Sequence, residues 1–383
     1  MKTTKTTRRL SLGTVALGPV MVLAACAGDG DDTDPSLNII LNGNPNGNAL
    51  ADIADQFSED TGIDIEVQVL SEQQMRDRVQ LNLQSQSSEM DVYMTLPSRE
   101  GPLFAASGYY EPLDDYLASA PEEYDADGFA PAAMDGMTID DEIIAMPMNV
   151  EGPVMFYRRD VFDDLGIEVP ETIDELLAAA ETIEAEGDGI TPVTLRGIAD
   201  TVAYTFGPFM HADGLTWTSD GVPTFEDPRA HEAIEQYATL ARDYGPPGVI
   251  NYSFNESTQL FASGEVAIEL ESSNLFPNTV DPENSVVADD VGVANIPGGP
   301  DGSTPTILSW GLTVSPFSEQ QDAAWEFVQW ATAPEAQLTM AEDGIAPPRS
   351  SLFDDPTYQE ILDTEAEQEW RDALIYIQEN GNT

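Results

Sequence analysis

The stretch EIIAMPMNVEGPVMFYRRDVFDDLGIEVPETIDELLAAAETI, residues 142–183, decides how the chain folds. Its apolar beginning runs into a polar loop that contains a proline. The residues Pro153–Tyr157 that follow are apolar without a turn residue, which predicts a short strand. After an interruption by Gly and Pro, apolar residues recur at helical spacing, and Thr172 with Glu175 fits a capping box at the start of this helix. The polar loop at 148–151 therefore lies where one structural unit passes into another.

The chain before this stretch has the pattern of a strand–helix–strand unit. Leu37–Leu41 predicts a short strand, an amphipathic helix ends at Thr61-Gly62, and Ile63–Leu70 predicts a second strand. Since loops at the ends of such strands can meet a ligand, the turn-rich loop 42–47 is a candidate for binding. Further expected elements are a strand over Asp91–Met94 followed by a loop over 95–100, helices over Asp227–Tyr244 and Gln320–Thr332, and a strand over Thr306–Val314.

The charge of the chain is strongly acidic. Its 383 residues are 41% hydrophobic, enough for two domains with cores of their own, but 14 Lys and Arg residues stand against 70 Asp and Glu. All the lysines precede Cys26, so the basic residues after it are arginines alone. We interpret this charge as an adaptation to high salt, where self-repulsion is screened. An acidic surface for a cationic partner is the alternative, whereas nucleic acid and anionic lipid are poor partners.

The residues that are missing exclude several chemistries. Without a lysine after Cys26 there is no phosphate-loop lysine and no Schiff base there, and one cysteine forms no intrachain disulfide or cysteine metal cluster. His231-Glu232 begins like a zinc-protease motif, but position 235 is Glu. None of the acid-rich stretches has EF-hand spacing. We therefore expect no cofactor, no metal and no enzymatic activity.

The first 26 residues predict a bacterial lipoprotein leader. A basic segment precedes an interrupted apolar run that is too short for a good membrane span, and the run ends in Leu-Ala-Ala-Cys, which matches the lipobox. We expect a signal peptide over 1–25, lipidation of Cys26, and a flexible acidic tether over 26–35. The twin-arginine and general export routes both stay open.

Several segments together resemble the bacterial extracellular solute-binding proteins of ABC importers, the group that includes the maltose/maltodextrin-binding protein. The segments are NALADIADQFSEDTGIDIEV, MDVYMTLPSREGPLFAASGYYEPLDDYL, MPMNVEGPVMFYRRDVFDDLG, the FASGEVAI feature, TILSWGLTV and IAPPR. Tyr157-Arg158 with Asp160, and Trp310-Gly311, are similar to the sugar-alcohol and trehalose-type members. The resemblance covers Asn38 to about Arg349. Beyond it, where members usually continue through more helices, we expect a single helix at about Thr364–Gln378, and whether the chain is complete stays open.

The resemblance implies an α/β fold of the periplasmic-binding-protein type (type II), with two lobes that each have a central mixed sheet flanked by helices. Crossings between the lobes are expected near 150–157 and 305–313. Lobe 1 is expected to comprise 36–150 and 309–345, and lobe 2 to comprise 151–308 and 346–383. The implied protein is a lipid-anchored monomer on the outer face of the cell membrane. It captures a sugar, oligosaccharide or sugar alcohol by hinge closure and delivers it to permease subunits.

The resemblance and the chemistry of the loops also select candidate ligand-binding residues. Aromatic faces suit the C–H faces of sugars, while amides, carboxylates and guanidinium groups suit their hydroxyls. For each candidate a purely structural role, in a turn, a surface salt bridge or a core, is the alternative. The candidates are Asn42, Asn44, Leu96, Arg99, Glu100, Asn149, Glu151, Tyr204, Phe206, Ser273, Asn274 and Trp310.

Two other functions remain open at this point. The same fold could bind a polyamine or a metal cation, which the net charge favours, although the candidate loops offer amides and aromatics rather than clustered acids. A secreted glycosidase is less favoured, since paired carboxylates cleave sugars but a pair means little among 70 acids.

Overall fold

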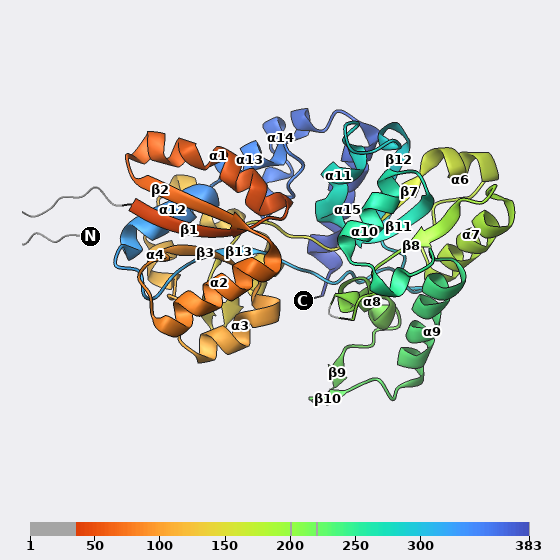
Figure 1. Cartoon of the computed structure of the whole chain (residues 1–383), viewed down its shortest axis with the longest axis horizontal. Helices are drawn as coiled ribbons and strands as arrows, with labels where there is room; N and C mark the ends of the chain where they lie inside the picture. The colour runs from red at the N-terminus through yellow and green to blue at the C-terminus, as the bar shows by residue number, and fades with distance from the viewer. Residues whose placement is uncertain (1–35, 200, 220, 383) are drawn as a thin grey trace, which may run out of the picture. The chain divides into compact units, whose positions relative to one another are not determined.

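The computed structural model describes residues 36–199, 201–219 and 221–382 (Figure 1). The expected signal peptide, the lipidation of Cys26 and the acidic tether lie outside these residues. Within the described ranges, no helix is both long enough and apolar enough to cross a membrane.

Lobe 1 is built on a five-stranded mixed sheet with the order β2-β1-β3-β13-β6. β1 is parallel to β2 and β3, with Ile39 opposite Val67 on one side and Val92 on the other. β13 runs antiparallel to β3 and β6, so a strand from late in the sequence completes this sheet. The strands are β1 (Ser36–Asn42), β2 (Asp64–Leu70), β3 (Val92–Thr95), β6 (Met146–Pro147) and β13 (Gly311–Val314).

Four helices of lobe 1, α1, α2, α3 and α12, follow the ends of its strands. Asn44 caps the start of α1, and Gly62, in the left-handed conformation that favours glycine, ends it as predicted. Phe57 of α1 packs edge-on against Phe327 of α12 in the core. The helices are α1 (Pro45–Thr61), α2 (Glu72–Ser85), α3 (Pro97–Ala106), α4 (Asp114–Ala118), α5 (Pro131–Gly136), α12 (Gln321–Ala331) and α13 (Pro334–Ala341), with the small hairpin β4 (Thr138–Ile139) and β5 (Glu142–Ile143).

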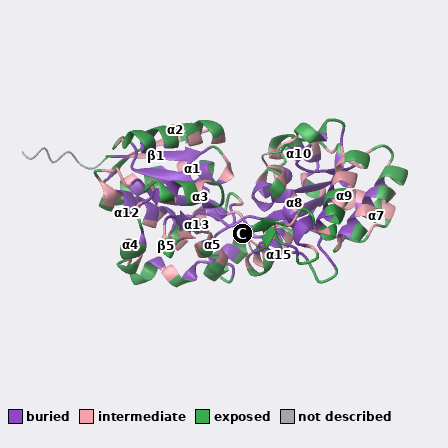
Figure 2. Cartoon of the chain, turned by 90° about the horizontal axis from the view of Figure 1, so that it is seen from below, coloured by how far each residue is buried: buried purple, intermediate pink, exposed green. Residues whose placement is uncertain are grey.

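Lobe 2 is built on a four-stranded mixed sheet with the order β12-β7-β11-β8. β7 is antiparallel to β11 and β12, while β11 is parallel to β8. Figure 2 shows the strands of both sheets buried and the outer helices exposed. The strands are β7 (Pro153–Arg158), β8 (Thr191–Thr194), β11 (Val266–Ser272) and β12 (Val291–Asn295), with the hairpin β9 (Thr218–Ser219) and β10 (Val222–Pro223).

The predicted capping box of lobe 2 is present: Thr172 Oγ1 accepts a bond from Glu175 N, and the Glu175 carboxylate accepts one from Thr172 N. The helix it starts is α7. The helices of lobe 2 and of the C-terminal segment are α6 (Arg159–Leu165), α7 (Ile173–Glu186), α8 (Val202–His211), α9 (Pro228–Asp243), α10 (Phe254–Ala262), α11 (Phe276–Val280), α14 (Pro356–Ile361) and α15 (Glu365–Asn380).

The two crossings between the lobes are bonded to each other. Glu151 N donates to Leu308 O over 2.9 Å, and Leu308 N donates to Glu151 O over 2.8 Å. Met148 N also donates to Trp310 O over 2.7 Å. These bonds hold the two crossings side by side. The first crossing leads from β6 of lobe 1 into β7 of lobe 2, and the second leads into β13 of lobe 1.

The structure confirms the predicted two-lobed fold with a mixed sheet in each lobe. It corrects three details. Pro97 starts α3, so residues 97–100 form its first turn rather than a loop. The strand expected over Thr306–Val314 is regular only in β13, and two helices rather than one follow Arg349. The lobe boundaries stay a proposal: α15 packs on β12 of lobe 2 while the short α14 packs on α13 of lobe 1 (Figure 1).

Candidate functional site

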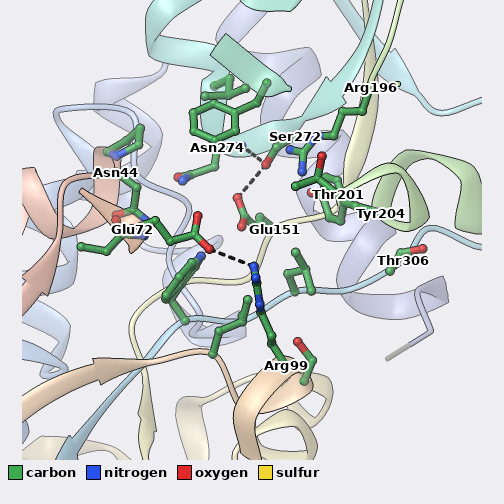
Figure 3. Close-up of a pocket in the computed structure, with 18 of the residues that line it drawn as sticks. Asn44, Glu72, Arg99, Glu151, Arg196, Thr201, Tyr204, Ser272, Asn274 and Thr306 are labelled. Carbon is green, nitrogen blue, oxygen red and sulfur yellow. Dashed lines mark hydrogen bonds and ion pairs between the residues drawn. The ribbon is translucent and has the colours of Figure 1, made fainter. Parts of the chain in front are cut away.

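A cavity of about 690 Å³ lies where the crossings meet the strand ends of both lobes (Figure 3). Lobe 1 lines it with the loop after β1, the start of α2 and the first turn of α3. Lobe 2 lines it with the segment after β8, with α8 and with the end of β11. Its wall comprises Asn42, Gly43, Asn44, Pro45, Ser71, Glu72, Leu96, Ser98, Arg99, Glu151, Arg196, Thr201, Ala203, Tyr204, Trp217, Phe254, Asn255, Ser272, Asn274, Leu275, Thr306, Leu308 and Trp310.

The lobe 1 wall combines amides with an ion pair. Asn44 Oδ1 accepts a bond from Gly47 N over 2.9 Å, which fixes the turn from β1 into α1. A Cβ at Gly47 would lie 1.9 Å from Asn42 O, so this close turn requires glycine. Arg99 pairs with Glu72 over 3.2 Å, and both side chains remain partly exposed to the cavity.

The crossings supply an aromatic face and a carboxyl group. Trp310 is 5% exposed, and the Arg76 guanidinium lies 5.5 Å from its ring centroid on a cation–π contact. Glu151 is buried, and its Oε2 accepts a bond from Ser272 Oγ over 2.6 Å. Burial raises the pKa of Glu151 to about 7, although the Ser272 hydroxyl and the Arg196 charge oppose that rise.

The lobe 2 wall is organised around Arg196. Its Nε donates to both carboxylate oxygens of Glu271 over 2.8 Å, and a second nitrogen also bonds Glu271. The guanidinium lies 4.5 Å from the ring centroid of Tyr204 and 5.7 Å from that of Phe254. Arg196 thus holds a buried carboxylate and two aromatic rings in fixed positions beside the cavity.

Four buried polar atoms of the cavity wall have no hydrogen-bond partner among the described residues. They are Thr201 Oγ1, Tyr204 Oη, Asn274 Oδ1 and Thr306 Oγ1, and Figure 3 shows their side chains on the lobe 2 side and the crossing. Buried polar groups are costly when they are unpaired. Their positions on the lobe 2 wall and on the adjoining crossing indicate a place for a ligand rich in hydroxyl groups.

The structure brings most of the predicted residues together at this cavity. Asn42, Asn44, Leu96, Arg99, Glu151, Tyr204, Asn274 and Trp310 all line it. Their contact with a ligand stays a prediction.

Four predicted residues lie outside the wall. Glu100 pairs with Arg76 and accepts a bond from Leu96 N over 2.8 Å, so it closes the first turn of α3. Asn149 is fully buried, and its Oδ1 accepts a bond from Trp310 N over 3.0 Å. Glu100 and Asn149 therefore hold neighbouring segments in place behind the cavity wall.

The other two belong to lobe 2. Phe206 packs edge-on against Trp217 and Tyr237. Ser273 is fully buried, and its carbonyl accepts a bond from the indole N–H of Trp370 over 2.8 Å. Its neighbour Ser272 is the serine that faces the cavity, because successive residues at the end of β11 point to opposite sides.

Sequence reasoning missed several wall residues, of which Arg196 and Glu72 are the charged ones. Arg196 follows the buried strand β8 in a chain with few basic residues, and this position was a usable signal. Glu72 begins α2 directly after β2, again at a strand end. The described residues contain no group of three or more His, Cys, Asp or Glu side chains arranged to hold a metal ion.

The fold and cavity define a two-lobed protein with a cavity between its lobes, and comparison with known proteins gives the family. Residues 42–338 match the model of the family described as bacterial extracellular solute-binding protein. The chain belongs to this family, which confirms the resemblance predicted from the sequence.

Individual relatives indicate the kinds of solute that similar proteins bind. A mannitol-binding protein of Pseudomonas aeruginosa is 30% identical over 286 residues, which are 73% of this chain and 64% of that protein. The chain thus spans just under two thirds of that relative. A solute-binding protein of Agrobacterium vitis S4 with bound D-mannitol is 27% identical, with a TM-score of 0.73 over 85% of this chain and 80% of its own. One from Agrobacterium radiobacter K84 in complex with ribitol shares the fold at a TM-score of 0.80 and 23% identity, over 91% and 87%.

Proposed function

We propose that this chain is the substrate-binding component of an ABC importer and that it captures an uncharged sugar, oligosaccharide or sugar alcohol. The observation that carries this proposal is the set of four unpartnered polar atoms on the wall of a cavity that Trp310 also lines. A polyhydroxylated ligand offers hydroxyl groups to the first and C–H faces to the second. The relatives that bind mannitol and ribitol support the same class of ligand.

The cavity is lined from both lobes and from the crossings, and this supports a hinge-closure mechanism. A ligand that contacts Arg99 of lobe 1 and Tyr204 of lobe 2 stabilises the closed arrangement, because it has both contacts only there. The closed receptor then docks on the permease subunits. No step of this cycle requires a cofactor.

The family and the leader predicted from the sequence together support a proposal for where in the cell the protein is located. We propose that the mature chain is a monomer held at the outer face of the cell membrane by lipid on Cys26. Substitution of Cys26 by serine should release the protein from the membrane fraction without changing its ligand affinity. Retention of the serine variant would remove the lipid anchor from the proposal.

The charges around the cavity argue against a cationic ligand. Glu72 is paired with Arg76 and Arg99, and Glu271 with Arg196, so acids do not dominate the wall as they dominate the whole chain. We also propose that the protein binds without turnover. Incubation with oligosaccharides and an assay for new reducing ends tests this, and release of reducing ends would establish a glycosidase instead.

A thermal-shift screen in molar salt tests the ligand class. The panel contains D-mannitol, ribitol, maltose, a polyamine and a divalent metal salt. A ligand at about 100 times its dissociation constant adds roughly 2.7 kcal/mol to the free energy of unfolding. We expect a rise in Tm with an uncharged sugar or polyol. A response to the cations alone would overturn the proposal.

A further inference from the structure

Glu151 and Arg196 line the cavity, and the carboxyl group of Glu271 lies behind Arg196. Glu271 is fully buried, and both of its carboxylate oxygens accept hydrogen bonds from the Arg196 guanidinium. Glu151 is 6% exposed, and the donors that reach its carboxyl group are both neutral: the Ser272 hydroxyl and the indole N–H of Trp310. Of these two buried acids, Glu271 is the one that forms the ion pair with Arg196.

A buried carboxylate that lacks a cation of its own is costly, and a carboxyl group in that position keeps its proton instead. The other charged and titratable groups near Glu151 do not change this balance. Arg196 is already bonded to Glu271, and burial raises the pKa of the nearby Tyr204, which keeps that phenol neutral. Across the cavity, Arg99 is paired with Glu72, and Arg76 with Glu72 and Glu100.

The position of Glu151 couples this carboxyl group to the hinge. Its backbone forms the double hydrogen bond with Leu308 that joins the two crossings, while its side chain reaches Ser272 at the end of β11. Figure 3 shows the carboxyl group at the centre of the site, between the two walls. A ligand held between the lobes thus lies against Glu151.

We propose that Glu151 meets the ligand as a neutral carboxylic acid, with its proton on Oε1, and that ligand binding is therefore linked to the uptake of a proton. This inference rests on the proposed function and adds how the site recognises its ligand. Oε2 accepts from Ser272, so Oε1 is the oxygen that donates to a ligand hydroxyl. A neutral donor also selects uncharged hydroxyl groups over ammonium groups, because an ammonium group offers it no acceptor.

The pKa of about 7 that burial gives Glu151 sets the pH range of the effect. Below that value the donor form is already present in the free protein. Above it, the ligand must bind to the minor protonated form. The dissociation constant should then rise by about tenfold for each pH unit, and nearly one proton should be taken up per ligand bound.

The first experiment needs no ligand. The native state holds the Glu151 proton up to about pH 7, while an unfolded glutamate loses it near pH 4.5, so wild type loses stability over this interval. Glu151→Gln keeps the shape and cannot ionise. We expect the Tm of wild type, measured against that of Glu151→Gln, to fall as pH rises from about 4.5 to about 7 and then to level off. A constant difference across this range would show that Glu151 is ionised in the native state and would overturn the proposal.

A second variant separates titration from a merely structural role. The Ser272 hydroxyl bonds the ionised form of Glu151 and so lowers its pKa. Ser272→Ala should therefore move the levelling point of this Tm profile to higher pH. A loss of stability that is equal at every pH would contradict the assignment.

The binding experiment uses D-mannitol as the probe. Titration calorimetry at pH 6, 7, 8 and 9 should give an affinity that declines above neutral pH in wild type. At pH 8 the measured heat should depend on the ionisation enthalpy of the buffer as expected for proton uptake. Glu151→Gln should lose both the pH slope and the buffer dependence.

The outcomes distinguish the two proposals. If D-mannitol and the other neutral probes fail to bind at every pH, the proposed function fails, and the ligand-free Tm profile alone decides the protonation of Glu151. If D-mannitol binds with the same affinity at pH 6 and pH 9, the proposed function stands and the proton linkage is wrong.

Discussion

At the scale of single residues, the site combines fully paired charges with unpaired hydroxyl groups. Arg196 and Glu271 satisfy each other in a buried position, while Tyr204 Oη and Thr306 Oγ1 have no partner in the part of the chain that the structure describes. The two arrangements have opposite consequences for mutation. Removal of one member of the pair leaves a buried charge, whereas removal of an unpaired hydroxyl removes a group that already costs stability.

The ion pair gives the first prediction. Arg196→Ala leaves the Glu271 carboxylate buried without a cation, which should lower the free energy of unfolding by about 3–5 kcal/mol. The double variant Arg196→Met with Glu271→Met removes both charges and should recover most of this loss. Denaturant unfolding of the three proteins measures it. Equal stability of the single and double variants would contradict the assigned pairing.

Tyr204 gives the second prediction, in which one substitution preserves the stability of the free protein but weakens ligand binding. Tyr204→Phe deletes the unpaired hydroxyl, so the free protein should be at least as stable as wild type. If that hydroxyl bonds the ligand, the variant should bind about fivefold more weakly, which is a loss of about 1 kcal/mol. Thermal unfolding and calorimetric titration with the same preparation test both halves. A destabilised variant with unchanged affinity would assign the hydroxyl to the structure rather than to the ligand.

At the scale of elements, strand ends and helix caps position the site. Four wall segments follow a strand: the Asn42–Asn44 turn follows β1, Leu96 follows β3, Arg196 follows β8 by two residues, and Asn274 follows β11. The Asn42–Asn44 turn and Leu96 could be predicted because turn residues and strand ends have local sequence signals, and Asn274 from the family resemblance, whereas Arg196 was missed. The correction at residues 97–100 has a local cause as well, since Pro97 is compatible with the first position of a helix and here starts α3.

The capping box of α7 gives the third prediction. Thr172→Ala removes the side chain that bonds Glu175 N and should lower the free energy of unfolding by about 1 kcal/mol. Thr182→Ala, in the same helix, removes an exposed hydroxyl bonded to Ala178 O and serves as the control. Denaturant unfolding compares them. A loss in the control as large as that in Thr172→Ala would show that the cap is not responsible.

The candidate site shows where sequence reasoning stops. The wall positions of Asn42, Asn44 and Arg99 were predictable from strand ends and from the family resemblance. The choice between Ser272 and Ser273 was not, because it depends on which face of β11 turns toward the cavity. Nor could the sequence show that Glu100 is used to hold Arg76, since that pairing joins α3 to α2.

At the scale of the whole molecule, charge is the dominant feature. The chain carries a formal net charge of −56, and most of the acids lie on exposed positions of the described residues. Charges on a surface repel one another over the Debye length, which shortens from about 10 Å at 0.1 M salt to about 3 Å at 1 M. We propose that the protein works in high salt, which provides this screening.

Salt dependence gives the fourth prediction. The Tm should rise steadily as NaCl is increased from low concentration to above 1 M, because screening relieves the self-repulsion of the folded state. The measurement is a series of thermal melts at fixed pH. KCl serves as the control for a specific effect of sodium and should give the same curve. A Tm that is independent of salt, or that falls with it, would contradict the adaptation to high salt.

The central claim is that the cavity at the crossings binds one uncharged, polyhydroxylated solute against Trp310. Calorimetric titration of the purified protein in molar salt with D-mannitol, ribitol and maltose tests it most directly, with Trp310→Ala beside wild type. We predict binding of at least one of these ligands, one molecule per chain, and a loss of affinity on the order of tenfold in the variant, which removes the aromatic face. Binding of cations alone, or an affinity that Trp310→Ala leaves unchanged, would contradict the account.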